Sequence, residues 1–351
     1  MSTDILHKTN RLISLMIKGQ FDVIVYKIGA KFNKQLVLPS FPDSLNIEPT
    51  NACNLKCPAC KTGSGRLQRP NVMMSFDNYR KIIDDVRGYV NYIGLFFMGE
   101  PFLNKDILKM INYTSLAGID VEVSTNAQFF TSQDFCLKVV KSGLNHCVIS
   151  LDGADQETLS KYRVGADFNK IITGIKYLQN AKKELASKTP TIEIQFIVMK
   201  HNEYQRKIMK TLAESLGVEI FCEKTMAIPI DRFDGSGQQD FADMFLPENL
   251  DNSRYYKNND GKYYLKGSIP NKCSRVYVSA VINAEGNVVP CCYDIDSEHI
   301  MGNIFEEPLK TIWKNKKFQK FRKQIKKDRA SIPMCNKCSE GRYLHLNKNR
   351  I

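Results

Sequence analysis

Three cysteines lie close together in the sequence: Cys53, Cys57 and Cys60. Three residues separate the first two and two residues separate the last two, so one loop can present three thiolates to one face of a metal cluster. A 4Fe–4S cluster normally takes four thiolates, which leaves one iron open to another ligand. A zinc knuckle is the alternative, but zinc needs a fourth ligand, and the nearest histidines are His7 and His146. The spacing therefore predicts an iron–sulfur cluster with an open iron.

A second set of cysteines lies toward the C-terminal end. It consists of Cys273, Cys291, Cys335 and Cys338. A hairpin and a distal Cys-x2-Cys loop can together bind zinc or an iron–sulfur cluster, and the spacing alone leaves both open. Cys292 adjoins Cys291, so either member of this pair could be the ligand.

Strand-like and helix-like segments alternate through the first two thirds of the chain. The predicted strands are Leu45–Glu48, Ile93–Phe97, Ile119–Val123, His146–Leu151, Thr191–Val198 and Val218–Glu223. The predicted helices are Phe76–Gly88, Lys105–Ala117, Ser132–Ser142, Phe168–Leu185 and Tyr204–Leu216. This alternation predicts an α/β fold, a partial (β/α)6 barrel. The chemistry of such barrels lies at the carboxyl ends of the strands, and the first cysteine loop follows the first strand.

The alternation ends near Ile228, which divides the chain into four predicted parts. They are an amphipathic helical segment (residues 1–41), the barrel (42–228), a linker or long loop (229–272) and a small C-terminal domain (273–351). In the small domain, Val276–Ile282 and Val288–Val289 form a predicted β-hairpin. Leu309–Arg329 forms a predicted helix with one apolar side.

The first cysteine loop resembles the signature of the radical S-adenosylmethionine (SAM) superfamily, and the resemblance extends over about Leu45–Glu223. It implies that the open iron binds the amino and carboxylate groups of SAM, and that reductive cleavage gives a 5′-deoxyadenosyl radical. Met98-Gly99-Glu100-Pro101 resembles the family's Gly-Gly-Glu-Pro segment, from which it departs at Met98. Later strand ends match further family segments in the same order. These matches imply the SAM contacts Glu100, Ser124, Asn126, Ser150, Asp152 and Arg163.

The second cysteine set, with four residues between Gly286 and Cys291, resembles the SPASM/twitch auxiliary-cluster domain. The resemblance favours a second 4Fe–4S cluster over zinc and implies the following ligands: Cys273, Cys291, Cys335 and Cys338. No cysteine follows Cys338, as in the shorter twitch form with one fully ligated cluster. Such a cluster serves in electron transfer or structure.

Two residues beside this set are candidates for catalysis. Cys292 is a ligand, a small buried cysteine or a free thiol that returns a hydrogen atom to a substrate radical, as in some radical SAM epimerases. Asp294 resembles an acidic residue that acts as the base in related oxidations, although it does not occupy the same position relative to the cysteine. The alternative is that Asp294 is a solvated loop residue. Oxidation is slightly favoured, because a fully ligated cluster beside a substrate is useful as an electron acceptor.

Composition limits the class of protein. The chain has 351 residues, of which 43% are hydrophobic and 25% charged, as is ordinary for a globular protein. The apolar run Leu12–Ile17 is too short for a membrane span or a signal peptide, so we expect a cytoplasmic protein with reduced cysteines. Cys136, Cys147 and Cys222 stand alone in apolar stretches, which predicts that they are buried.

The net charge of +13 is unevenly distributed, and Leu309–Arg329 holds ten Lys or Arg residues but one acid. A basic stretch can meet phosphates, nucleic acid or an anionic membrane. A solvated basic face on an amphipathic helix is the more common explanation, and the lack of interleaved aromatic residues argues against nucleic acid.

These features predict a radical SAM oxidoreductase that oxidises or epimerises a small polar, sugar-like substrate, with or without a phosphate or nucleotide group. Peptide modification is the alternative, although about 40 residues before the first strand are too few for the recognition module of such maturases. A nucleic-acid or membrane binder with structural clusters is the third interpretation. The resemblance implies SAM, two 4Fe–4S clusters and an electron donor such as flavodoxin or ferredoxin. Strand-end candidates for the substrate pocket are Gln195, Asn202 and Lys224.

Overall fold

The computed structural model describes residues 40–232, 238–339 and 345–350, together with residues 16, 21, 24 and 25. Almost all of the predicted helical segment 1–41 therefore lies outside the described residues. The described chain folds around one ten-stranded sheet. In sheet order its strands are β11 (Gly302–Asn303), β10 (Asn287–Val289), β9 (Ser279–Ile282), β1 (Ser44–Ile47), β2 (Tyr92–Gly94), β3 (Asp120–Thr125), β4 (His146–Ser150), β5 (Thr191–Val198), β6 (Ile220–Thr225) and β12 (His345–Arg350).

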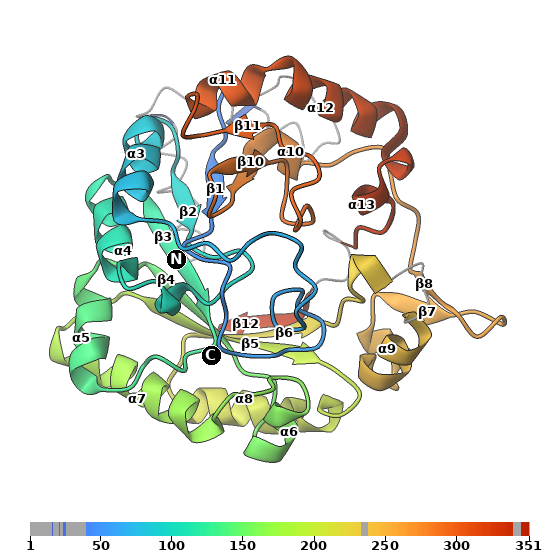
Figure 1. The fold of residues 1–351 in the computed structure, drawn as a ribbon. Coiled ribbons are helices and arrows are strands. Elements are labelled where there is room, and N and C mark those ends of the chain that lie inside the picture. The colour runs from blue at the N-terminus through green and yellow to red at the C-terminus, as the bar shows by residue number, and fades with distance from the viewer. Residues whose placement is uncertain are drawn as a thin grey trace.

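Strands β1 to β6 are parallel, and helices connect them along the outer side of the curved sheet (Figure 1). These helices are α3 (Phe76–Val86), α4 (Ile107–Leu116), α5 (Gln133–Lys141), α6 (Gln156–Ser160), α7 (Phe168–Glu184) and α8 (Arg206–Ser215). The structure confirms the predicted α/β partial barrel, with its six strands and five main helices. The carboxyl ends of β1 to β6 therefore lie along the same edge of the sheet, where the candidate residues are found.

Strand β5 illustrates how the sequence sets the two faces of the sheet. Side chains alternate between the faces, and Ile192, Ile194 and Phe196 are fully buried. Glu193 and Gln195 lie between them and belong to the opposite, inner face. The apolar face packs against helices, so polar groups collect on the inner face, where a barrel holds its chemistry.

The C-terminal hairpin extends the main sheet. Strand β9 pairs in parallel with β1, in a register that aligns Leu45 with Ala280. The prediction of a strand over Val276–Ile282 is wrong for its first residues, since Arg275–Val278 forms the short helix α10. The Val276 carbonyl accepts a hydrogen bond from buried Arg322, a tertiary contact that overrides the strand preference of the β-branched residues.

Residues 229–272 contain more structure than the linker or loop predicted for them. They form α9 (Gln238–Phe245) and a small hairpin of β7 (Tyr255–Lys257) and β8 (Tyr263–Leu265). Phe241 and Phe245 are buried, whereas the exposed Tyr256 and Tyr264 stack on each other across the hairpin. These elements are too short to give a sustained period in the sequence.

The predicted basic helix is present as α11 (Leu309–Lys314) and α12 (Lys316–Asp328). Asn315 breaks the helix, and its side chain accepts a hydrogen bond from the Phe318 amide to cap α12. The apolar side predicted for this helix is buried, and it comprises Leu309, Ile312, Trp313, Phe318, Phe321 and Ile325. Short α13 (Pro333–Asn336) follows. Among the described residues, no helix is long and apolar enough to cross a bilayer.

Candidate active site

The first cysteine loop leaves β1 and is fixed by its own backbone and by a neighbouring segment. The Lys56 amide donates to the Val164 carbonyl (2.9 Å), and the Cys60 amide donates to the Cys57 carbonyl (3.2 Å). The Leu55 amide donates to Cys53 Sγ (3.4 Å), the kind of hydrogen bond that tunes cluster ligands. The loop is thus held in one shape by contacts that leave its thiols available.

The chemistry of these thiols suits a positively charged metal group. Burial, with smaller contributions from Glu100 and the other two thiols of the loop, raises the pKa of Cys53 to about 11. Burial also raises the pKa of Cys57, an effect that the nearby Arg163 guanidinium partly offsets. Buried thiols at such short range are stable as thiolates only beside strong positive charge, which iron supplies. Within the described residues, no three Cys, His, Asp or Glu side chains converge as the ligands of a single metal ion would.

The Met98–Pro101 segment packs directly on the cysteine loop. The Glu100 amide donates to the Ala52 carbonyl (2.9 Å). A Cβ added at Gly99 would lie 2.1 Å from the Thr50 carbonyl oxygen and 2.6 Å from that of Ala52. Only glycine fits such a close approach of two backbones, whereas the position of Met98 tolerates a side chain.

Glu100 is buried and joins this segment to the end of β3. Its carboxylate accepts hydrogen bonds from the Phe102 amide (3.1 Å), the Thr125 hydroxyl (2.7 Å) and the Asn126 amide (2.8 Å). Burial nevertheless raises the pKa of Glu100 to about 7. In this arrangement Glu100 positions the surrounding loops, and the predicted contact of its side chain with SAM stays a prediction.

Asn126, Asp152 and Arg163 lie around the cysteine loop. The side-chain Nδ2 of Asn126 donates to Oδ1 of Asn54, which lies between the first two cysteines in the sequence (2.8 Å). Arg163 Nε donates to Asp152 Oδ2 (2.5 Å), and Asp152 also accepts the Ile197 amide (2.6 Å). Asp152 therefore holds Arg163 close to Cys57, where its charge acts on that thiol. The two predicted serines, Ser124 and Ser150, lie near the ends of β3 and β4.

The structure also brings the second cysteine set together. Burial raises the pKa of Cys291 well above its usual value, and nearby Cys292, Cys273 and Cys338 raise it further. Burial raises the pKa of Cys335 to about 12, Arg329 offsets part of this rise, and Cys338 and Cys273 add to it. The Tyr293 amide donates to Cys291 Sγ (3.4 Å), as the Leu55 amide does to Cys53. Cys291 thus lies near Cys273 and Cys338, and its predicted role as a cluster ligand stays a prediction.

A cavity of about 320 Å³ lies between the two cysteine sets, with Cys60 on one wall and Cys292 on another. The remaining lining residues are Ala59, Lys61, Met98, Tyr162, Ile197, Lys224, Thr225, Met226, Ala227, Ile228, Pro229, Arg254, Tyr293 and Ile295. Among the described lining residues there are three cationic side chains and no carboxylate. Of the predicted pocket residues it contains Lys224, whereas Asn202 instead donates to the Asp152 and Ile197 carbonyls.

Asp294 and Cys292 are placed differently. Cys292 is a lining residue of the cavity, and its sulfur accepts a hydrogen bond from Arg275 (3.3 Å). Asp294 is buried away from the lining, and its carboxylate accepts the amides of Glu298 (2.8 Å) and His299 (2.9 Å). Burial raises the pKa of Asp294. The structure thus brings Cys292, but not Asp294, to the cavity, and Asp294 fixes the turn that follows it.

Sequence reasoning missed a buried carboxylate, Glu48, that joins both cysteine loops. Arg69 forms two hydrogen bonds with Glu48 (2.8 and 2.9 Å) and one with Glu285 (2.8 Å). Glu48 also accepts the amides of Met98 (3.2 Å) and Ala284 (3.0 Å). A charged residue at the end of the apolar first strand was the available signal, because a buried carboxylate needs partners.

A second link connects the same two regions. Lys61, directly after the first cysteine set, forms an ion pair with Asp296, just beyond the second. Asp296 also accepts the Gln68 amide (3.1 Å), and Arg69 donates to the Ile295 carbonyl (2.8 Å). The loops that carry the two cysteine sets are therefore tied together by two separate groups of polar contacts.

Comparison with protein families identifies two matching regions. Residues 47–212 match the model of the radical SAM superfamily. Residues 273–339 match SPASM, described as an iron–sulfur cluster-binding domain. Each of these two regions contains one of the cysteine sets described above.

Curated relatives align over most of the chain. AdoMet-dependent heme synthase of Methanosarcina barkeri is 25% identical over 320 residues, or 82% of this chain and 86% of that protein. Mycofactocin maturase of Mycolicibacterium smegmatis is 26% identical over 295 residues, or 78% and 70%. GTP 3′,8-cyclase of Clostridium acetobutylicum is 27% identical over 308 residues, or 79% and 91%. The names of these proteins indicate that they act on different substrates.

Solved structures share the fold. Streptococcus suis SuiB bound to S-adenosylmethionine aligns with a TM-score of 0.60 and 18% identity, over 84% of this chain and 70% of that one. BtrN in complex with AdoMet and 2-DOIA aligns with a TM-score of 0.52 and 17% identity, over 86% and 94%. At this identity the likeness concerns the fold.

Proposed function

We propose that this protein abstracts a hydrogen atom from a small anionic substrate bound between its two cysteine sets. The chain belongs to the radical SAM superfamily and carries a SPASM domain. The first set would hold the SAM-binding 4Fe–4S cluster, and the second set an auxiliary cluster. When bound, SAM and its cluster supply a 5′-deoxyadenosyl radical, which takes a hydrogen atom from the substrate. The observation that carries this proposal is the shared cavity, which both Cys60 and Cys292 line.

The charge of the cavity supports an anionic substrate. Arg254 is occupied by Thr225 and Ser339, and Lys61 by Asp296. Lys224 forms no ion pair with any carboxylate among the described residues; it is the penultimate residue of β6 and lines the cavity. A volume of about 320 Å³ suits a small molecule. Lys224 would therefore bind a phosphate or carboxylate group of the substrate.

Proposed SAM contacts follow from the same arrangement. Arg163 lies beside Cys57 and is oriented by Asp152, so its guanidinium suits the SAM carboxylate. Ser124, Ser150 and Asn126, at the ends of neighbouring strands, would line the rest of the SAM site. Asp152 would then act on SAM through Arg163 rather than by a direct contact.

The position of Cys292 favours return of a hydrogen atom over oxidation. The substrate radical takes a hydrogen atom from the Cys292 thiol, so a C–H bond forms and the S–H bond breaks. The resulting thiyl takes one electron and one proton, supplied by the electron donor and by solvent, which restores the thiol. Attack from the opposite side would invert the carbon. Oxidation instead requires a base in the cavity, where Asp294 does not lie.

Turnover in deuterated water tests this step. Candidate substrates are first screened as anionic and neutral sugars, nucleotides and peptides, by 5′-deoxyadenosine formed above the uncoupled background. Solvent deuterium should then appear on one carbon of the product, and Cys292→Ser should abolish its incorporation while 5′-deoxyadenosine still forms. Cys222→Ser, at a buried cysteine outside the cavity, is the matched control. A product two hydrogens lighter, without deuterium and equally formed by Cys292→Ser, would establish oxidation instead.

Peptide modification is the second candidate function. The similarity to mycofactocin maturase, over 78% of this chain, favours it. The same screen separates the two, because a peptide substrate should raise 5′-deoxyadenosine formation when sugars and nucleotides do not.

A further inference from the structure

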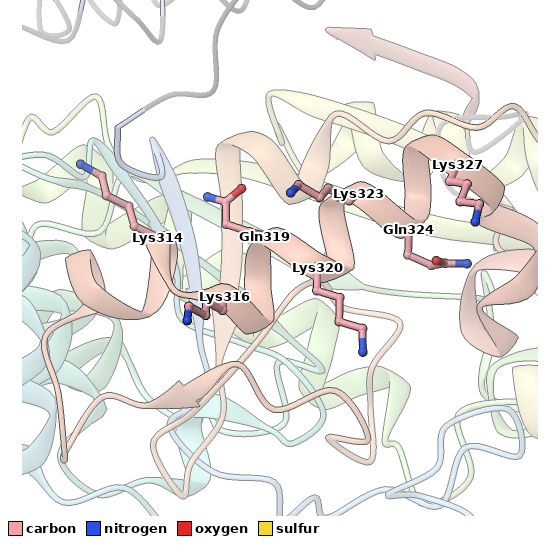
Figure 2. A pocket seen from close by; sticks show the side chains of 7 residues that line it. All are labelled: Lys314, Lys316, Gln319, Lys320, Lys323, Gln324 and Lys327. Atoms are coloured by element: carbon pink, nitrogen blue, oxygen red, sulfur yellow. The ribbon is translucent and has the colours of Figure 1, made fainter.

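Five exposed lysines, which we call the lysine row, lie along α11 and α12. They are Lys314, Lys316, Lys320, Lys323 and Lys327. With Gln319 and Gln324 they line a surface pocket of about 400 Å³ (Figure 2). The four on α12 are spaced by four, three and four residues, which places them on one helical face.

The lysine row differs from several other exposed helical faces. There a cation is paired with an acid four residues away, as in Lys138–Asp134 on α5, Lys161–Glu157 at the end of α6 and Lys210–Glu214 on α8. No ion pair of this kind involves the lysine row within the described parts of the chain. Like charges one turn apart destabilise a helix, so this face lowers the stability of α12. An anionic partner would offset that repulsion.

The side chains around the row indicate the kind of partner. Within the described parts of the chain, only lysine and glutamine side chains line the pocket, although Lys314 Nζ also lies 5.1 Å from the centroid of the Phe41 ring. Membrane-surface helices insert apolar residues beside their cations, and single-stranded nucleic acid stacks on aromatic residues. The apolar residues of α12 are instead turned inward, where Phe318 and Ile325 are buried. The row therefore best fits a hydrophilic, acidic protein surface.

The row also ends next to the second cysteine set. The Lys327 carbonyl accepts a hydrogen bond from Asn271 (3.1 Å), and Arg329 donates to the Lys272 carbonyl (2.8 Å), directly before Cys273. Arg329 lies close enough to Cys335 to act on its thiol. A protein seated on the row would thus contact the domain that the second cysteine set belongs to.

We propose that the lysine row is the docking surface for the acidic one-electron carrier that supplies this enzyme with electrons. The inference rests on the proposed function, since a radical SAM reaction needs an electron donor. Lysine charges would attract the carrier and orient it, and the contact would be transient and sensitive to salt.

Binding of a bacterial flavodoxin, an acidic carrier, tests the proposal on the reconstituted full chain. Charge reversal at Lys316, Lys320 and Lys323 to Glu should raise the dissociation constant at least about tenfold, and wild-type affinity should fall steeply between about 50 and 200 mM salt. The matched control reverses three exposed lysines of α7, Lys170, Lys176 and Lys183, and changes the net charge equally. Its affinity should stay within about twofold of wild type.

Rates of 5′-deoxyadenosine formation provide an independent readout. With limiting reduced flavodoxin, the row variant should be slower than wild type, whereas dithionite should drive both equally. Absence of SAM cleavage with dithionite would count against the proposed function, while the binding comparison would still test the docking surface. Equal flavodoxin binding by the row variant and wild type, or an equal loss in the α7 control, would overturn the proposal. So would duplex DNA or anionic vesicles that bind more tightly than flavodoxin through the row.

Discussion

A single histidine, His146, is held inside the sheet by two carboxylates from neighbouring strands. Its Nδ1 lies 2.6 Å from Glu122 Oε2, and its Nε2 lies 3.2 Å from Glu193 Oε2, close but not aligned for a hydrogen bond. Lys348 of β12 also pairs with Glu193 (2.8 Å). Burial lowers the pKa of His146, but both carboxylates outweigh it and raise the pKa to about 9. Burial raises the pKa of Glu193, but His146 and Lys348 lower it to about 2.

These pKa values predict how stability depends on pH. The folded-state pKa of His146 lies above the ordinary value of 6.5, so its contribution is complete below pH 6.5 and is lost as the pH rises through about 9. Urea unfolding should show that the stability advantage of wild type over His146→Gln shrinks between these values, by up to about 3 kcal/mol.

His201→Gln is the matched control, because burial lowers the pKa of His201 and this residue is neutral throughout that window. A constant difference between wild type and His146→Gln from pH 6.5 to 9 would show that His146 is not charged in the folded protein.

At the scale of single residues, the sequence identified the cysteines but not the buried polar residues that hold their loops in place. Cys53, Cys57 and Cys60 are recognisable because their spacing is local. Glu48, Arg69 and their partners come from distant parts of the chain, and only the fold brings them together. Cys291 and Cys292 are indistinguishable in sequence, and only the fold separates Cys291, near Cys273 and Cys338, from Cys292, which lines the cavity.

Among the elements, the loops after β1 and after β10 act as one unit through Glu48. Its carboxylate is fully buried and connects Arg69, Met98 and Ala284. The cysteine loop, the Met98–Pro101 segment and the C-terminal hairpin therefore depend on one ion pair. Removal of one partner of a buried pair leaves the other charge uncompensated.

Arg69→Met should destabilise the protein by about 3–5 kcal/mol, because Glu48 remains buried and charged. Glu285→Gln removes a partner that is 19% exposed and should cost about 1 kcal/mol or less. Arg69→Lys keeps the charge but not the paired hydrogen bonds, and should lie between them. Urea unfolding measures all three, and the account fails here if Glu285→Gln costs as much as Arg69→Met.

The predicted helices and strands match the structure where the sequence pattern is long. They differ from it where tertiary contacts determine the local conformation. Helix α7 and strand β5 carry complete periods and match their predictions. Strand β12 has the polar sequence HLNKNR and no strand pattern, yet it pairs with β6 along the sheet edge. Helix α10 forms in a strand-like sequence because Arg322, stacked 3.8 Å from the Phe318 ring, holds the Val276 carbonyl.

On the scale of the whole molecule, one continuous sheet carries both cysteine sets. The hairpin of β9 and β10 extends the barrel sheet beside β1 (Figure 1). The cavity is lined by Cys60 of the first set and by Cys292, which adjoins Cys291 of the second. The lysine row lies on α11 and α12, beyond the second set. Substrate, SAM and electron donor would thus approach the same pair of cysteine sets from different sides.

Iron content and SAM cleavage, measured together on one variant, test the central claim. Anaerobically reconstituted wild type should bind about eight iron atoms as two 4Fe–4S clusters and form 5′-deoxyadenosine with dithionite. Simultaneous change of Cys53, Cys57 and Cys60 to Ala should remove half of the iron and abolish 5′-deoxyadenosine. The matched triple change at the lone buried cysteines, Cys136, Cys147 and Cys222, should leave both unchanged. If the first variant still forms 5′-deoxyadenosine, these cysteines do not hold the SAM-cleaving cluster and the account is wrong.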